Sequence, residues 1–196
     1  MGIYSFLKKV ANFHIIGHIA VGKTSIIRRY VHDVFEMNYV STIGADFQSK
    51  KENINGTTVC LHIYDTAGQE KFDSLTKNLL RNSNGVIIVF DLSNEESFKK
   101  VEKWIKYVDD SNVPNIQIVL VGNKSDCDHV VKKGDAQAIA DNYQINYFET
   151  SALNGSNIND VFKYLTNISL NYLSDSPDVS IKQEGSEDNQ GGRRCC

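Results

Sequence analysis

The stretch Gly17-His18-Ile19-Ala20-Val21-Gly22-Lys23-Thr24 decides the fold of this 196-residue chain. It fits the pattern G-x-x-x-x-G-K-[ST] and lies between an apolar run, Ala11–Ile16, and a segment with helical spacing, Lys23–Asp33. A loop between a strand and a helix can present successive backbone N–H groups, and the helix N-terminus adds partial positive charge. The sequence therefore predicts a phosphate-binding loop.

Two side chains of this loop have predicted roles of their own. Lys23 is expected to reach the β- and γ-phosphates of a nucleotide and to act in catalysis. The Thr24 hydroxyl is expected to bind Mg²⁺, a hard cation that prefers oxygen ligands. The residues predicted to contact the nucleotide here are Ala20, Val21, Gly22, Lys23, Thr24 and Ser25.

Strands and helices are expected to alternate along the rest of the body. An Asn55-Gly56 turn predicts a hairpin of two strands, and apolar runs predict three further strands. Such alternation predicts an α/β fold: a six-stranded, mostly parallel sheet with one antiparallel edge strand and helices on both faces. Beyond the first strand and helix, the expected strands are Asp46–Asn53, Thr57–Tyr64, Gly85–Phe90, Ile116–Val121 and Ile145–Glu149, and the expected helices are Glu95–Asp110, Lys132–Asn142 and Asn157–Leu173.

A second motif, Asn123-Lys124-Ser125-Asp126, follows a predicted buried strand and indicates which base is bound. The Asp126 carboxylate can accept two hydrogen bonds, from N1–H and the 2-amino group of guanine. Adenine offers neither, so a buried acceptor would be left unpaired and adenine would be rejected. Asn123 is expected to bond the base and tie loops together, and the Lys124 stem to cover the ring face.

Two further motifs follow predicted strands. In Asp65-Thr66-Ala67-Gly68-Gln69-Glu70, Asp65 is suited to holding the metal through water, and Gly68 lets its N–H approach the γ-phosphate. Gln69 can orient an attacking water in catalysis. In Ser151-Ala152-Leu153, the predicted contact is between the Ala152 N–H and guanine O6.

Together these motifs resemble those of the Ras superfamily of small GTPases over about residues 10–173. Their order and spacing fit, with 48 residues from Gly17 to Asp65, 58 from Asp65 to Asn123 and 28 from Asn123 to Ser151. The resemblance implies GTP, GDP and Mg²⁺ as ligands. By position, Thr42 resembles the switch threonine that senses Mg²⁺ and the γ-phosphate. Phe35 resembles the aromatic that packs edge-on against guanine.

Within the superfamily, three stretches resemble the Rab branch: Ser41–Phe47, Leu61–Phe72 and the ending Arg193-Arg194-Cys195-Cys196. The resemblance implies geranylgeranyl groups on Cys195 and Cys196, and a role in vesicle traffic. The expected location is the cytoplasmic face of endomembranes, with a cytosolic pool. The implied partners are effectors, an exchange factor, an escort protein, a prenyltransferase, a dissociation inhibitor and an activating protein.

Composition supports this assignment and excludes some classes. The net charge is −3 with no basic stripe, which argues against nucleic-acid binding. No cysteine spacing suggests disulfides or zinc, so a reducing compartment is expected. In residues 174–194 five acids outnumber three bases and no aromatic occurs, which predicts a flexible linker. The predicted domains are a G domain, 1–173, and a tail, 174–196.

Some residues depart from the family pattern. Ile19 stands where the pattern has a smaller residue, and a branched side chain there would crowd Gln69, so slow GTP hydrolysis is expected unless the loop shifts to accommodate it. An alternative is a binding module that stays GTP-bound with negligible turnover; a P-loop kinase or ATPase is disfavoured by Asp126. His18, Ala20, Tyr64 and Leu79-Leu80 also depart, and the last two alter the expected effector surface.

Overall fold

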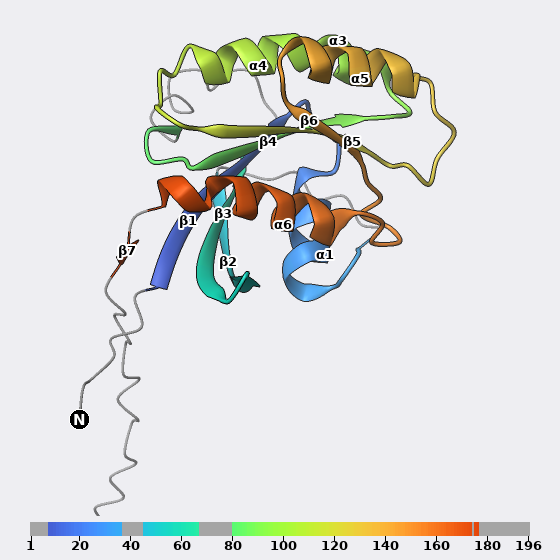
Figure 1. Ribbon diagram of the computed structural model, residues 1–196. Helices are drawn as coiled ribbons and strands as arrows, with labels where there is room; N and C mark the ends of the chain where they lie inside the picture. Colours follow the sequence, from blue (N-terminus) through green and yellow to red (C-terminus); the bar gives the residue numbers. More distant parts are fainter. Residues whose placement is uncertain (1–7, 37–44, 67–79, 174, 177–196) are drawn as a thin grey trace, which may run out of the picture.

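The computed structural model describes residues 8–36, 45–66, 80–173 and 175–176 of the chain. Six strands form a sheet in the order β2-β3-β1-β4-β5-β6. Four neighbouring pairs are parallel and the edge pair β2–β3 is antiparallel. Helices α1 and α6 lie on one face, and α3, α4 and α5 lie on the other (Figure 1). The predicted fold class is confirmed.

The elements begin and end close to their predicted positions. The strands are β1 (Lys8–Gly17), β2 (Ala45–Ile54), β3 (Thr57–Thr66), β4 (Gly85–Asp91), β5 (Gln117–Asn123) and β6 (Asn146–Glu149). The helices are α1 (Lys23–His32), α3 (Glu95–Lys99), α4 (Val101–Asp109), α5 (Lys133–Asn142) and α6 (Ile158–Ser169), and a 3-10 turn, Leu170–Tyr172, follows α6.

Two hydrophobic layers hold the helices to the sheet, because successive side chains of a strand point to opposite faces. In β4, Ile87 and Val89 belong to the layer beneath α1 and α6, whereas Val86, Ile88 and Phe90 belong to the layer beneath α4 and α5. Every residue of β4 is buried, as expected for a central parallel strand.

The structure differs from the expected elements in two places. The single helix predicted over Glu95–Asp110 is divided at Lys100 into α3 and α4. Helix α3 is held to the end of β4 by buried Ser97, whose Oγ lies within hydrogen-bond distance of the Asp91 main chain. A two-residue strand β7 (Asp175–Ser176) pairs antiparallel with the first residues of β1. Within the described residues, no helix combines the length and apolar character needed to cross a bilayer.

Candidate nucleotide-binding site

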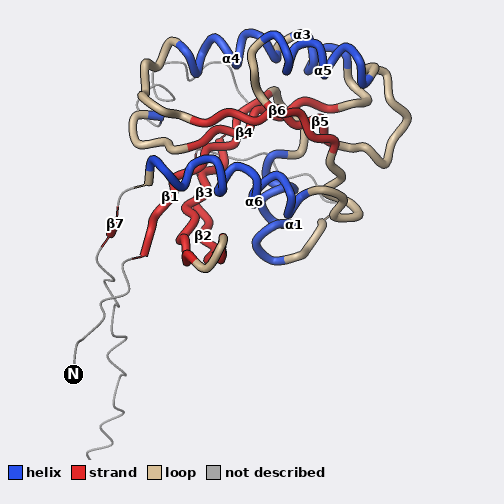
Figure 2. Tube along the Cα trace, viewed as in Figure 1, coloured by secondary structure: helices blue, strands red, loops and turns tan. Residues whose placement is uncertain are grey.

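The predicted site residues follow the carboxyl ends of neighbouring parallel strands, which all meet at one edge of the sheet. The loop after β1 leads into α1, and the loops after β5 and β6 lie beside it (Figure 2). Ligands of open α/β sheets bind at this edge. The motifs separated in the sequence are therefore brought together.

The backbone of the loop after β1 requires glycine at two positions. Gly17 and Gly22 have φ angles of 145° and 95°, in the region that L side chains rarely adopt. A Cβ atom at Gly17 would lie 2.1 Å from the Val89 carbonyl oxygen, and one at Gly22 would lie 2.4 Å from Asn123 Nδ2. Ala20 is also left-handed, at 61°. The loop thus has a tightly curved main chain suited to an anion.

Lys23 is held inside this loop. Its Nζ donates to the carbonyl oxygens of Gly17, at 3.1 Å, and His18, at 2.8 Å. The residue is 6% exposed, and burial lowers the pKa of Lys23 to about 8, although the Asp65 carboxylate opposes this shift. A buried ammonium group fixed by carbonyls is suited to an incoming phosphate, since a phosphate would supply the missing negative charge.

The two described residues predicted to bind the metal contact each other. Thr24 Oγ1, in the first turn of α1, donates to Asp65 Oδ2, near the end of β3, over 2.5 Å. Asp65 is buried, at 2% exposed. A hydroxyl and a carboxylate form the hard-oxygen donor set that Mg²⁺ prefers, so these residues fit the ion.

Asn123 joins the phosphate-binding loop to the loop after β6. Its Nδ2 donates to the Val21 carbonyl oxygen at 2.9 Å. Its Oδ1 accepts from Thr150 Oγ1 at 3.2 Å and from the Ala152 N–H at 3.3 Å. The side chain is 1% exposed, so these bonds are sheltered from water. The predicted loop-tying role of Asn123 is present in the structure.

Asp126 lies beside the same loop. Its Oδ1 accepts a short hydrogen bond from the Ser151 hydroxyl. This bond lowers the pKa of Asp126, so the carboxylate stays ionised as an acceptor. Ser151 is fully buried, whereas Asp126 itself is exposed and not the buried acceptor that the sequence led us to expect.

Lys124 takes part in an ion pair that the sequence did not reveal. Its Nζ lies 2.5 Å from Asp91 Oδ2, and Asp91 is buried at the end of β4. Asp91 Oδ1 also accepts from the main-chain N–H and the hydroxyl of Ser93. Asp91 pairs in register with Asn123, and a carboxylate at the end of a buried strand is the signal that sequence reasoning overlooked.

The other predicted residues divide into two groups. Ser25 lies in the first turn of α1, Phe35 packs partly buried against the core layer of α1, and Leu153 is 43% exposed. Five lie outside the described residues, namely Thr42, Gly68, Gln69, Cys195 and Cys196. Their roles stay predictions.

Comparison with known proteins identifies the family. The model of the Ras family matches residues 12–171. The chain belongs to the Ras family. Human Ras-related protein Rab-27A is 38% identical over 197 residues, spanning 94% of this chain and 88% of that protein. GTP-binding protein ypt1 of Schizosaccharomyces pombe is 34% identical over 202 residues, spanning 98% of both. Ras-related protein Rab-1D of Dictyostelium discoideum is 35% identical over 190 residues, spanning 93% of both.

This Rab-like GTPase departs from its family pattern at several residues, and these residues lie in different environments in the structure. Ile19 is 42% exposed on the phosphate-binding loop. His18 has its ring nitrogens 3.3 and 3.4 Å from Lys100 Nζ, at the division between α3 and α4. Tyr64 packs against half-exposed Phe47, with ring centroids 5.3 Å apart. Leu80 is fully buried and belongs to the core, so its expected place on the effector surface was wrong, and Leu79 lies outside the described residues.

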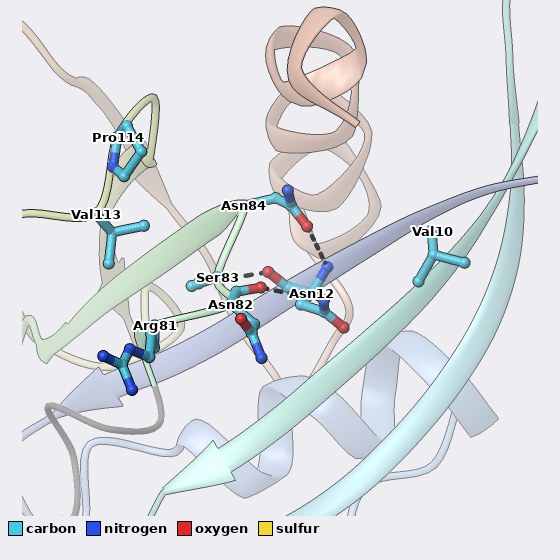
Figure 3. A pocket seen from close by; sticks show the side chains of 8 residues that line it. All are labelled: Val10, Asn12, Arg81, Asn82, Ser83, Asn84, Val113 and Pro114. Atoms are coloured by element: carbon cyan, nitrogen blue, oxygen red, sulfur yellow. Dashed lines mark hydrogen bonds between the residues drawn. The ribbon is translucent and has the colours of Figure 1, made fainter. Parts of the chain in front are cut away.

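A cavity of about 410 Å³ lies away from the nucleotide-binding edge of this Rab-like protein, near the starts of β1 and β4 (Figure 3). Its polar side chains largely bond the local main chain. Asn84 Oδ1 accepts from the Asn12 N–H, and Asn12 Nδ2 donates to the Asn82 carbonyl oxygen. No predicted site residue lines it, and its amides connect the turn before β4 to β1.

Proposed function

We propose that the protein is a guanine-nucleotide-dependent switch that binds GTP, hydrolyses it slowly to GDP, and regulates vesicle traffic. The observation that carries this proposal is the bonding of Asn123. One buried side chain contacts the phosphate-binding loop at Val21 and the loop after β6 at Ala152. A site built in this way would contact the base and the phosphates of the same molecule.

Each of the described site residues has a separate proposed role. Lys23 would neutralise the β- and γ-phosphates, and Asp126 would accept from the guanine N1–H and 2-amino group. Thr24 and Asp65 would hold Mg²⁺, which offsets phosphate charge. In the family pattern, Thr42 and Gly68 sense the γ-phosphate and Gln69 orients the attacking water. Loss of the γ-phosphate would release the segments around Thr42 and Gly68.

Calorimetric titration with GDP and ADP in the presence of Mg²⁺ tests the base specificity. We expect GDP to bind far more tightly than ADP. Asp126→Ala should lower GDP affinity about 10- to 150-fold, because it removes bonds to a charged acceptor. Asp128 is the matched control, since it is an exposed acid two residues away, and Asp128→Ala should leave the affinity unchanged. Equal binding of GDP and ADP by the folded protein would refute the assignment.

A second candidate function is a GTP-bound binding module with negligible turnover, which is favoured by the exposed branched side chain of Ile19 on the phosphate-binding loop. Single-turnover GTP hydrolysis, measured for the protein and for Ile19→Ser, separates a slowly hydrolysing switch from a module with negligible turnover. If Ile19 crowds Gln69, hydrolysis should be slow and Ile19→Ser should raise its rate. The control Val34→Ser, at another exposed apolar residue, should leave the rate unchanged. Mostly GTP in the purified protein would favour the binding module. An ordinary rate that Ile19→Ser does not raise contradicts slow hydrolysis.

Membrane attachment is proposed to use geranylgeranyl groups on Cys195 and Cys196, with an escort protein, a prenyltransferase and a dissociation inhibitor as handling partners. Two chains are needed because one prenyl chain gives only reversible binding and the acidic tail adds no basic anchor. Prenylation followed by vesicle sedimentation tests this. Each single Cys→Ser variant should bind vesicles weakly and the double variant not at all. Cys127→Ser, at an exposed cysteine of the body, should behave as the unsubstituted protein.

A further inference from the structure

Arg29, near the end of α1, makes four hydrogen bonds beside the proposed base-binding residues. Its Nε donates to the Ala152 carbonyl oxygen at 2.9 Å, and one terminal nitrogen donates to the Leu153 carbonyl oxygen at 2.8 Å. The other terminal nitrogen donates to Asp33, to the carbonyl oxygen at 2.9 Å and to Oδ1 at 3.0 Å. One guanidinium group therefore contacts two segments that are far apart in the sequence.

Both segments carry residues that the sequence predicts to contact the base. Ala152 is the residue whose N–H is expected to bond guanine O6, and it now donates to Asn123 Oδ1 over 3.3 Å. Asp33 ends α1 in a left-handed conformation, with φ at 56°, and Phe35 follows two residues later. Arg29 thus fixes the direction of both chains as they enter the pocket.

The bonds are of a kind that an arginine can supply and a lysine cannot. The guanidinium group is planar, always charged and carries five N–H donors in a fixed fork. Within the described residues, no main-chain N–H donates to the carbonyl oxygen of Ala152 or Leu153. The side chain of Arg29 is 18% exposed, so water competes little for these bonds. Arg29 therefore supplies the hydrogen bonds to these two carbonyl oxygens, whereas Asn123 accepts from the Ala152 N–H.

We propose that Arg29 is a positioning residue for the guanine base: by holding the carbonyls of Ala152 and Leu153 it aims the Ala152 N–H at the 6-oxo group. This inference rests on the proposed function, because it assumes that guanine nucleotides bind here. The carbonyls of Ala152 and Leu153 belong to the two peptide planes that follow the Ala152 N–H, and only the φ and ψ angles of Ala152 separate that N–H from the first restrained plane. Helix α1 begins at Lys23, so the same rigid element carries the phosphate contacts and the support of the base.

The test compares the dissociation rates of GDP and of 6-thioguanosine diphosphate, which keeps N1–H and the 2-amino group for Asp126 but replaces the 6-oxo oxygen with sulfur, a weaker hydrogen-bond acceptor. In the unsubstituted protein the analogue should leave up to about fivefold faster than GDP, which corresponds to loss of one hydrogen bond of about 1 kcal/mol. In Arg29→Ala the GDP rate should rise and the ratio of the two rates should fall toward one. Arg28→Ala is the matched control, because Arg28 is the adjacent residue of α1 and pairs with exposed Glu36.

Arg29→Lys keeps the charge and most of the stem, and the ratio of dissociation rates is measured on this variant if Arg29→Ala does not fold. A single ammonium group cannot reproduce the fork, so the ratio should again fall. Equal acceleration of both nucleotides would show that Arg29 only stabilises the fold, and unchanged rates would show that it does not support the site; either result overturns the proposal. Failure of the proposed function would be seen separately, as equal binding of GDP and ADP by the unsubstituted protein.

Discussion

The buried histidine of β1 should make the stability of this protein depend on pH. His14 is 2% exposed, its ring stacks on Tyr64 with centroids 4.5 Å apart, and its Nδ1 lies 3.1 Å from Ser83 Oγ. Burial lowers the pKa of His14 to about 4. The folded protein therefore keeps this imidazole neutral at pH values where an exposed histidine takes up a proton.

The sign of the effect follows from which state binds the proton. In the unfolded chain the His14 pKa is close to 6.5, so between about pH 6.5 and pH 4 the unfolded state binds more protons. The free energy of unfolding should thus fall as the pH drops through 6.5, and this contribution levels off only below about pH 4. Linkage gives a loss of about 2 kcal/mol between pH 8 and pH 5.

Urea unfolding at a series of pH values, followed by the fluorescence of Trp104, measures this loss. His14→Gln cannot titrate but keeps a hydrogen-bonding side chain, so it should remove about 2 kcal/mol of the difference between pH 8 and pH 5. His32→Gln, at an exposed histidine of α1, should leave the difference in place. If His14→Gln and the unsubstituted protein lose stability in parallel over this range, burial of His14 is not the cause.

Three further predictions concern the phosphate loop, the base loop and the core. Gly22→Ala adds a left-handed alanine, at about 1–2 kcal/mol, and displaces Asn123, so GDP should leave at least about 10-fold faster; Gly56→Ala has similar strain in open space and should not change GDP release. Asp91→Ala removes the ion pair with Lys124, which lies in the loop proposed to contact the base, and should speed GDP release about fivefold in a fluorescent-nucleotide exchange assay. Phe162→Ala should cost about 3–5 kcal/mol in urea unfolding, because the ring is fully buried.

The sequence predicted those features that depend on local patterns. Continuous apolar runs such as Val86–Phe90 indicated buried strands, and the Asn55-Gly56 turn located the hairpin. The division of the helix at Lys100 was missed, since the helical spacing of apolar residues continues across it. What divides it is a tertiary contact, because Ser97 bonds the end of β4, and periodicity carries no information about such contacts.

The candidate site divides in the same way. Gly22 and Lys23 were predictable because a tight anion-binding loop accepts few alternatives at those positions, and the required φ angle and the buried ammonium group are both present. Arg29 had no such signal, since an arginine in the last turns of an amphipathic helix reads as a solvent-exposed residue. Its bonds to Ala152 and Leu153 span 123 and 124 positions of the chain. A contact of that range forms only after α1 and α6 have packed on the same face of the sheet, so side chains that support a site from a distance emerge from the fold and not from the motifs.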